Sequence, residues 1–504
     1  MRLSIIIATL LACMASNAMA DDVPLKLSLK DAIRMGVEKN LDVRAELYNP
    51  AQFESDINRN KSIYDLLFTA QAMFTDATTM SANTFPLGSN SQQSFDFNSS
   101  LSRQFWTGAT ATVSLNNAYL KNTFNGSNAS TASASGLNSY WQSNLGLTIN
   151  QPLLKNLGRE NTEININVSR LLKFASIENF TTRLLNTVAQ VRTEYFKLYS
   201  LREELEVRQI SLELARKILA ETKARVSAGV LPAMEILNAE FGATSREKDL
   251  IDTEKALSDQ VDVLRLLLQI EGKGDILTAD LPRRDPLQVS VDDALRRTMS
   301  RPDIKEQKRN LEIAELQTRV FSNRIKPDLS IVASTSLTGL DNDYPGDLKM
   351  VGSFDAPVYS IGLNFIYPFG NNAAENDYRK SRLKSEQAAL QIRSLEEGAA
   401  NDVKSAIRGV VSGYKQIDVA DRGRAFAEER LRAFIRKNEV GLATTKDVMD
   451  VENDLVSAKN NQIVAVVNYD NAITRLWQVT GELLEREGVR VVEADADKLY
   501  ANIH

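Results

Sequence analysis

The stretch that decides the fold is 109–116, ATATVSLN, in which apolar and polar side chains alternate. Because successive side chains of a β-strand point to opposite faces, this alternation predicts a strand with one apolar face and one polar face. Five further stretches show the same pattern: 66–75, 94–103, 140–150, 329–337 and 359–367. Strands of this length are typical of transmembrane β-barrels, although a soluble β-sandwich with one solvated face explains any single stretch equally well.

The first residues of the chain indicate export. Arg2 precedes an apolar run over residues 3–15, and an A-x-A motif ends at Ala20, so we expect a signal peptide over 1–20 that is cleaved after Ala20. Acylation of Cys13 at a lipoprotein site is the alternative. No later stretch reaches the roughly 18 consecutive apolar residues of a membrane-spanning helix. Export, the Ser- and Asn-rich stretch 121–139 and aromatic residues at strand ends favour a membrane sheet over a sandwich.

The two halves of the chain share matching segments. Residues 28–34 (SLKDAIR) match 290–296 (SVDDALR), and 229–240 (GVLPAMEILNAE) align without a gap with 441–452 (GLATTKDVMDVE). An internal duplication is the economical explanation. We therefore expect two repeats, joined by a linker over 272–289 that contains glycines and prolines.

Long helices are predicted between the strands. The expected helical spans are 42–62, 161–228, 233–270, 303–325, 375–440 and 446–481. The span 161–228 contains no proline, and its apolar residues recur every seven positions, at Val191, Leu198, Leu205, Leu212, Leu219 and Val226. This heptad pattern is typical of a coiled coil. A solvated coiled-coil rod would explain the heptads, but it would not explain the intervening strands.

The composition excludes several classes of function. The chain has 60 Lys and Arg residues against 65 Asp and Glu residues, a net charge of −5 and no basic run, so nucleic acid is not an expected partner. The single histidine is His504 and the single cysteine is Cys13. Zinc sites, cysteine nucleophiles and histidine-based triads therefore lack their essential residues. We expect no enzyme, no cofactor and no metal site.

The chain, with its two repeats of strands and long helices, resembles the TolC-like outer-membrane efflux protein family. The resemblance covers essentially the whole mature chain. It rests on the paired helix openings, on QPLL at 151–154 and YPFG at 367–370 where strands pass into helices, and on the turns at Gly229 and Gly441. It implies an α+β membrane protein in the outer membrane of a Gram-negative bacterium. In it, a homotrimer closes one transmembrane β-barrel, which a long periplasmic α-helical coiled-coil tunnel continues.

The function that the resemblance implies is that of a passive outer-membrane channel, the exit duct of a tripartite efflux or type I secretion system. The implied partners are a periplasmic adaptor (membrane fusion) protein, an inner-membrane pump or ABC exporter, and outer-membrane lipid. A soluble periplasmic coiled-coil adaptor or scaffold is the alternative. The cargo cannot be inferred, because its selection normally belongs to the pump.

The resemblance also assigns a segment plan. Residues 21–62 hold an N-terminal segment and the short helices of the first repeat, 63–155 its barrel strands and extracellular loop, and 156–271 its long periplasmic helices. The second repeat has, in order, short helices, barrel strands and long periplasmic helices over 290–326, 327–370 and 371–481. A periplasmic tail follows over 482–504.

We expect six strands per protomer. Helices enter and leave the sheet on one side, so each repeat needs an even number of strands; the first repeat offers four and the second two. Three protomers would then build a barrel of about 18 strands, against about 12 for the family's usual two strands per repeat. The prediction depends on Trp106-Thr107-Gly108 forming a short periplasmic turn.

Four residues are expected at a periplasmic constriction. In the family, two acidic residues just after the second-repeat glycine project into the closed tip. The ungapped alignment places Asp447 and Asp450 there, with Glu235 and Asn238 at the equivalent first-repeat positions. Rings of carboxylates across a narrow pore attract cations. The alternative role of Asp447 is a capping box with Thr444.

Gly229 and Gly441 are expected to end the long helices at turns that face the adaptor, because glycine suits the point where a helix stops and the chain reverses. The family's latch can use an aromatic residue and an arginine where this sequence has Asn438 and Ala443. How the closed tip is latched therefore stays open. A bond from Lys446 to Glu235 of a neighbouring helix is one replacement, and a solvated lysine is the alternative.

Overall fold

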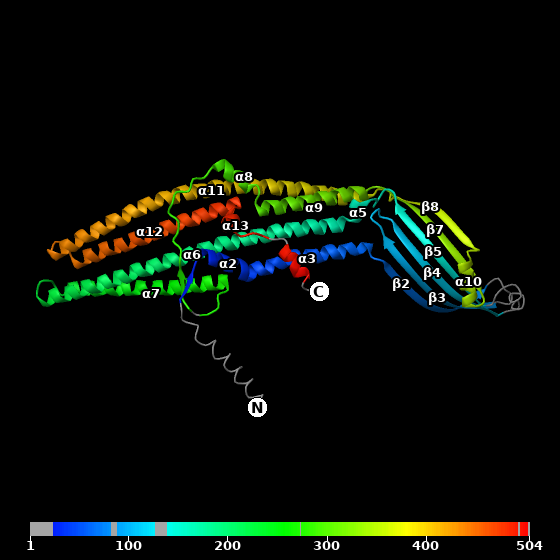
Figure 1. Ribbon diagram of the computed structural model, residues 1–504, viewed down its shortest axis with the longest axis horizontal. Helices are drawn as coiled ribbons and strands as arrows, with labels where there is room; N and C mark the ends of the chain where they lie inside the picture. Colours follow the sequence, from blue (N-terminus) through cyan, green and yellow to red (C-terminus); the bar gives the residue numbers. More distant parts are fainter. Residues whose placement is uncertain (1–23, 82–87, 126–138, 273, 492–493, 502–504) are drawn as a thin grey trace, which may run out of the picture. The chain divides into compact units, whose positions relative to one another are not determined.

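The computed structural model describes residues 24–81, 88–125, 139–272, 274–491 and 494–501. The expected signal peptide, with Ala20 and Cys13, lies outside these residues, and so does His504. The chain forms two compact units (Figure 1). The sheet unit comprises residues 52–174 and 309–390, and the helical unit comprises the residues before 52, 175–308 and those from 391 onward.

The sheet unit is built on a six-stranded antiparallel sheet with the order β2-β3-β4-β5-β7-β8. The strands are β2 (Leu67–Ser81), β3 (Gly88–Gln104), β4 (Thr110–Asn125), β5 (Ser139–Pro152), β7 (Asp328–Asp341) and β8 (Pro357–Ile366). Each of the six stretches with alternating side chains forms one of these strands. The expectation of six strands is thereby confirmed for the described part of the chain.

The connection between β3 and β4 is a tight turn. The Phe105 N–H donates to the Ala109 carbonyl at 2.8 Å, and the Gly108 N–H donates to the Phe105 carbonyl at 2.9 Å. Gly108 has φ +89°, a backbone conformation that glycine adopts without a Cβ clash. The turn expected at Trp106-Thr107-Gly108 is therefore present, and the stretch 63–155 contains four strands, β2 to β5.

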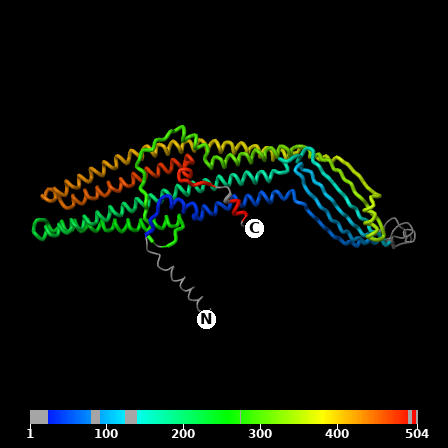
Figure 2. The backbone as a smooth tube through the Cα atoms, in the orientation of Figure 1, coloured from blue at the N-terminus to red at the C-terminus, as the bar shows by residue number. Residues whose placement is uncertain are grey.

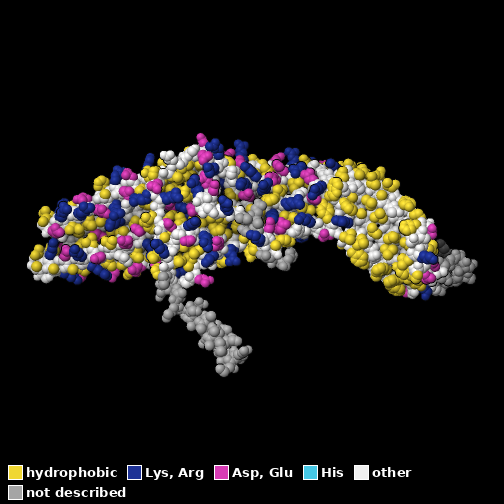
Figure 3. Space-filling model, viewed as in Figure 1, with side chains coloured by type: hydrophobic (Ala, Val, Ile, Leu, Met, Phe, Trp, Pro, Cys, Tyr) yellow, Lys and Arg dark blue, Asp and Glu magenta, His cyan; other side chains and the backbone are white. Residues whose placement is uncertain are grey.

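The strand register gathers apolar side chains on one face of the sheet. Leu101 pairs with Val113, which pairs in turn with Leu147. A second row on this face is aromatic, and its members are Phe74, Phe95, Tyr119 and Trp141. On the opposite face the hydroxyl oxygens of Thr69 and Ser100 lie 2.7 Å apart. Figure 3 shows apolar side chains over much of the visible sheet, whereas charged side chains are dispersed over the helices.

Helix α10 (Tyr344–Ser353) follows β7 and precedes β8 in the chain, and it packs on the apolar face of the sheet. Its Asp347 is fully buried and accepts hydrogen bonds from the backbone N–H of Ser143, at 3.1 Å, and from the Ser143 hydroxyl. A Cβ at Gly339 would overlap Asp347, so glycine permits the close approach. The expectation of strands only over 327–370 is therefore wrong, because the stretch also contains this helix.

The helices agree with the expected spans to within three residues at each end. Four of them contribute residues to both units: α3 (Leu41–Lys61), α6 (Ile164–Ser227), α9 (Pro302–Arg324) and α11 (Asn372–Glu439). The helical unit adds α2 (Leu29–Lys39), α7 (Met234–Leu268), α8 (Val291–Thr298), α12 (Thr445–Thr480), α13 (Leu483–Arg486) and α14 (Ala494–Ala501). The sheet unit adds a 3-10 helix, η1 (Ser62–Tyr64), and α5 (Arg159–Thr162). In the described ranges no helix is both long and apolar enough to cross a membrane.

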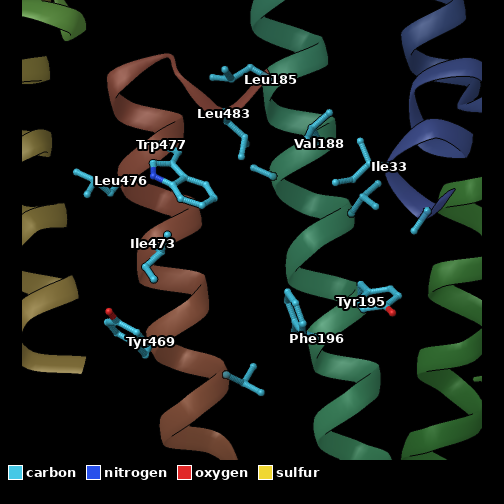
Figure 4. Close-up of a cluster of buried hydrophobic side chains, with 14 of the residues drawn as sticks. Ile33, Leu185, Val188, Tyr195, Phe196, Tyr469, Ile473, Leu476, Trp477 and Leu483 are labelled. Carbon is cyan, nitrogen blue, oxygen red and sulfur yellow. The ribbon is translucent and has the colours of Figure 1, made fainter. Parts of the chain in front are cut away.

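The core of the helical unit lies where α2, α6, α12 and α13 meet (Figure 4). It includes the heptad residues Val191 and Leu198, which are fully buried. The side chains labelled in Figure 4 are Ile33, Leu185, Val188, Tyr195, Phe196, Tyr469, Ile473, Leu476, Trp477 and Leu483. Burying apolar surface of this extent is the main favourable contribution to folding of the unit.

Strands β1 (Leu25–Leu27) and β6 (Ile276–Thr278) pair in parallel, so the expected linker over 272–289 contains a strand. Tyr195 of α6 fastens this pair. Its hydroxyl donates to the Leu27 carbonyl at 2.9 Å and accepts from the backbone N–H of Ala279 at 2.9 Å. Burial raises the pKa of Tyr195 to about 12, so the hydroxyl keeps its proton as a donor.

Candidate functional site

The candidate site lies where two helical hairpins end, α6 with α7 and α11 with α12. Figures 1 and 2 show these two ends on the same side of the helical unit. At the first, Gly229 has φ +72°, its N–H donates to the Val226 carbonyl at 2.9 Å, and the Val230 N–H donates to the Arg225 carbonyl at 2.9 Å. This pair of bonds is a Schellman motif, which satisfies the last carbonyls of a helix.

The second hairpin ends in the same way. Gly441 has φ +75°, its N–H donates to the Asn438 carbonyl at 3.1 Å, and the Leu442 N–H donates to the Lys437 carbonyl at 2.8 Å. A Cβ at either glycine would meet nothing within 4 Å, so the glycine is required by the positive φ and not by lack of space. Both glycines therefore end their helices as expected.

The helices that leave the two turns begin differently. Thr444 caps α12 in a capping box, with the Asp447 N–H donating to Thr444 Oγ1 at 3.1 Å and the Thr444 N–H donating to Asp447 Oδ2 at 2.8 Å. These bonds, led by the one from the Thr444 backbone, hold the pKa of Asp447 below its ordinary value. Helix α7 follows Pro232 and has no capping side chain. The capping alternative for Asp447 is therefore confirmed.

The four expected constriction residues differ in burial. Asp447 and Asp450 are exposed, and their spacing of three residues puts them on one side of α12. Glu235 and Asn238 of α7 are half-buried, and Glu235 Oε2 is buried without a hydrogen-bond partner. Among the described residues, no hydrogen bond or ion pair joins the two acidic residues of α12 to the two residues of α7, and Lys446 makes no ion pair with Glu235.

A contact that the sequence analysis did not identify joins the two hairpins near their ends. Arg225 Nη1 of α6 donates to the backbone carbonyl of Asn438 at 3.2 Å and to its side-chain oxygen at 3.3 Å. The Asn438 amide in turn donates to the Ala443 carbonyl at 2.9 Å. Asn438, which departs from the family's pattern, thus anchors both its own turn and the neighbouring hairpin. The only sequence signal was a basic residue in the last turn of α6.

A second missed contact lies further from the turns and joins α7 to α12. The Arg246 guanidinium donates to Glu452 Oε2 from two nitrogens, at 2.9 Å and 2.8 Å, and to the Met449 carbonyl at 2.7 Å. The Ser211 hydroxyl of α6 donates to the other Glu452 oxygen. Glu452 is buried, at 5% exposure, and Arg246 is largely buried, at 13%. A Cβ at Gly242 would overlap the Met449 sulfur, so glycine lets the helices approach.

Chemically, the site offers exposed carboxylates, helix caps and inter-helix bonds. Within the described ranges no group of three or more His, Cys, Asp or Glu residues could hold a metal ion. The arrangement can therefore present negative charge at the end of α12, and its hydrogen bonds can hold the two hairpins together or release them.

Comparisons with known proteins give one consistent family. The sequence model of the family described as outer membrane efflux protein matches residues 94–268 and 296–482, more than half of the chain. Outer membrane efflux protein BepC of Brucella suis is 23% identical over 71% of this chain and 76% of its own length. Outer membrane protein TolC of Escherichia coli is 21% identical over 59% of this chain and 62% of its own. Among solved structures, the Campylobacter jejuni CmeC outer membrane channel is similar in fold, with a TM-score of 0.65 at 14% identity over 94% of this chain and 89% of its own.

Proposed function

Because this chain belongs to the outer membrane efflux protein family, we propose that it is the passive exit duct of a tripartite efflux or type I secretion system. It is an outer membrane protein of a Gram-negative bacterium. The proposal adds three finer elements. The chain works as a homotrimer of two-repeat protomers, its turns at Gly229 and Gly441 face a periplasmic adaptor, and an inner-membrane pump or ABC exporter supplies the cargo.

The observation that carries the proposal is a six-stranded sheet with an apolar face and two free edges. In the part of the chain that the structure describes, β2 and β8 each pair on one side only, and every residue of β8 is exposed. An open sheet edge leaves N–H and C=O groups unpaired, which lipid cannot satisfy. Pairing of β8 with β2 of another copy would satisfy both edges, and three copies would close a barrel of about 18 strands.

The polar face of the sheet then lines a hydrated channel. Hydroxyl pairs such as Thr69 with Ser100 and Ser334 with Ser360 lie on that face. Barrels of this strand number enclose a water-filled lumen, whereas smaller barrels are filled by side chains. A passive duct requires no catalytic group, so conduction depends on whether the helical end is open.

Extraction and conductance test this function together. We expect the protein to stay in outer membranes washed with carbonate or urea, to require detergent, and to migrate as a trimer unless boiled. Purified trimers should form stepwise conductances in planar lipid bilayers. Release by carbonate without detergent, together with absent conductance, would favour the soluble adaptor or scaffold instead.

Adaptor docking at the turns has a separate test. Photo-crosslinkers placed at Ser227 and at Ala443 should capture a periplasmic adaptor in cells. The matched position is Lys349, which is exposed on α10 of the sheet unit. Capture from Lys349 but from neither turn would reverse the proposed orientation.

A further inference from the structure

A cleft of about 560 Å³ lies beside the tight turn that connects β3 to β4. Its lining residues come from η1, the end of β3, the turn itself and the region of α5, all within the sheet unit. They are Tyr64, Arg103, Gln104, Phe105, Trp106, Arg159 and Glu163. Two arginines, two exposed aromatic side chains and one glutamate thus share one cavity.

The wall of the cleft is prearranged by hydrogen bonds. Glu163 is buried, at 6% exposure, and both of its oxygens are occupied. The Tyr64 hydroxyl donates to Oε1 at 3.0 Å, and Arg159 Nε donates to Oε2 at 2.8 Å. Because the carboxylate is already paired and buried, it fixes the Arg159 side chain without filling the cavity.

Arg103 supplies cationic groups that have no anionic partner. Its Nε donates to the Tyr64 carbonyl at 3.1 Å, which orients the guanidinium at the cleft. Among the described residues no carboxylate pairs with Arg103 and no acceptor lies within hydrogen-bond distance of its terminal nitrogens. A guanidinium with free parallel N–H donors matches the paired oxygens of a phosphate.

The cleft lies at the end of the apolar face. Arg103 follows Leu101 by two residues on β3, so both side chains stand on that face. Phe105 and Trp106 come next and are 42% and 61% exposed. Exposed aromatic side chains beside a long cationic side chain, where an apolar surface ends, are typical of the membrane–water interface.

We propose that this cleft binds the phosphate headgroup of a phospholipid in the periplasmic leaflet of the outer membrane. Arg103 and Arg159 hold the phosphate, Trp106 and Phe105 lie at the level of the glycerol backbone, and the acyl chains follow the apolar face past Leu101. The assignment rests on the proposed function, in which that face contacts lipid. Two cations against one paired carboxylate leave the cleft with net positive charge, which suits an anionic lipid.

Native mass spectrometry of the detergent-solubilised full-length protein tests this site. The probe is phosphatidylglycerol. Two control ligands are used: diacylglycerol, which lacks the phosphate, and glycerophosphate, which lacks the acyl chains. We expect phosphatidylglycerol to bind at least about tenfold more tightly than either control ligand. Arg103→Gln should weaken the binding of phosphatidylglycerol about tenfold. Arg103→Lys keeps the charge but loses the parallel N–H donors of the guanidinium, so it should weaken binding less.

The control variant is Arg379→Gln, an exposed arginine of α11 that pairs with Glu375 and lies outside the cleft. Its affinity for phosphatidylglycerol should equal that of the unmodified protein. Arg103→Gln binding within twofold of the unmodified protein would overturn the site, and so would diacylglycerol or glycerophosphate binding as tightly as phosphatidylglycerol.

The same preparations also separate this proposal from the proposed function. Conductance of Arg103→Gln in planar bilayers should be unchanged, because the cleft does not line the channel. Normal conductance with unchanged lipid affinity in this variant would contradict the lipid site but not the exit duct. Absent conductance in the unmodified protein would contradict the exit duct, whatever the lipid result.

Discussion

At the scale of single residues, Asp447 combines a structural contact with an exposed charge. Its carboxylate caps the start of α12 through Thr444, yet the side chain is exposed, as is that of Asp450. A carboxylate that accepts cap bonds keeps its negative charge, so capping and a role at a pore constriction are compatible. Of the two first-repeat residues, Asn238 is neutral and Glu235 is half-buried, so the exposed carboxylates among the four residues lie on α12.

Neutralising the two aspartates tests the constriction. In single-channel recordings of the purified protein, Asp447→Asn with Asp450→Asn should lower the preference for cations over anions and weaken block by multivalent cations. The control is Asp418→Asn, an exposed aspartate of α11 that pairs with Arg422. Unchanged selectivity in the double variant would place the constriction elsewhere.

The cap has a predictable pH dependence. Because the pKa of Asp447 is lowered in the folded turn, the cap's contribution is fully present above about pH 4 and is lost as the pH falls through the lowered pKa. A spin label at Leu442 should therefore gain mobility only under strongly acidic conditions. In Asp447→Ala the label should be mobile at neutral pH and insensitive to acid; a label as immobile as in the unmodified protein would contradict this role.

At the scale of secondary-structure elements, polar contacts between the two hairpins supplement the apolar core of the helical unit near the turns. Arg246 of α7 with Glu452 of α12 is the most buried ion pair near the turns, and the Arg225 contact with Asn438 is closer to them. Removing one partner of a buried pair leaves the other charge desolvated and unpaired. These two contacts are therefore among the bonds that resist separation of the hairpins near their turns.

Arg246→Met should lower the free energy of unfolding by about 3 kcal/mol, because it leaves the buried Glu452 carboxylate without its cationic partner. The matched control is Arg216→Met, which breaks an exposed pair between α6 and Glu247 of α7 and should cost about 0.5 kcal/mol or less. Thermal unfolding of both variants, followed by circular dichroism, makes the comparison. Equal losses in the two variants would show that burial of the pair does not matter.

Helix α10 offers a second prediction at this scale. Asp347→Ala removes the acceptor for the Ser143 N–H and hydroxyl, so α10 should detach from the sheet. Limited proteolysis in detergent should then cut between β7 and β8, where the unmodified protein resists. Asp355→Ala, an exposed change just after α10, is the control. Resistance of the Asp347 variant equal to that of the control would mean that apolar packing alone holds the helix.

At the scale of the whole molecule, periodic features could be predicted and aperiodic ones could not. A period of two located the strands, because every second side chain of a strand points to the same face, and a period of seven marked the long helix expected over 161–228, because every seventh side chain lies on the same side of a coiled-coil helix. Gly229 and Gly441 located the turns, because a turn that needs a positive φ favours glycine. Helix α10 has only ten residues and β6 only three, so neither is long enough to show a period in the sequence.

The candidate site was only partly predictable for the same reason. Cap and turn residues interact within a few positions, so the Thr444 box and the two glycines could be found from spacing. The bond between Arg225 and Asn438 spans 213 residues, and that between Arg246 and Glu452 spans 206. Charged residues at such separations leave no local signal, and a solvated side chain is the default expectation for each.

Disulfide trapping across the free edges tests the central claim, that β8 of one protomer pairs with β2 of the next. Thr69→Cys on β2 is combined with Ser360→Cys, Gly362→Cys or Asn364→Cys on β8, all on the polar face. Thr69→Cys with Asn144→Cys on the inner strand β5 is the control. The account predicts that at least one β2–β8 combination is trapped in outer membranes as a covalent trimer, while the control gives monomers. Monomers from every β2–β8 combination, or covalent assemblies other than trimers, would contradict it.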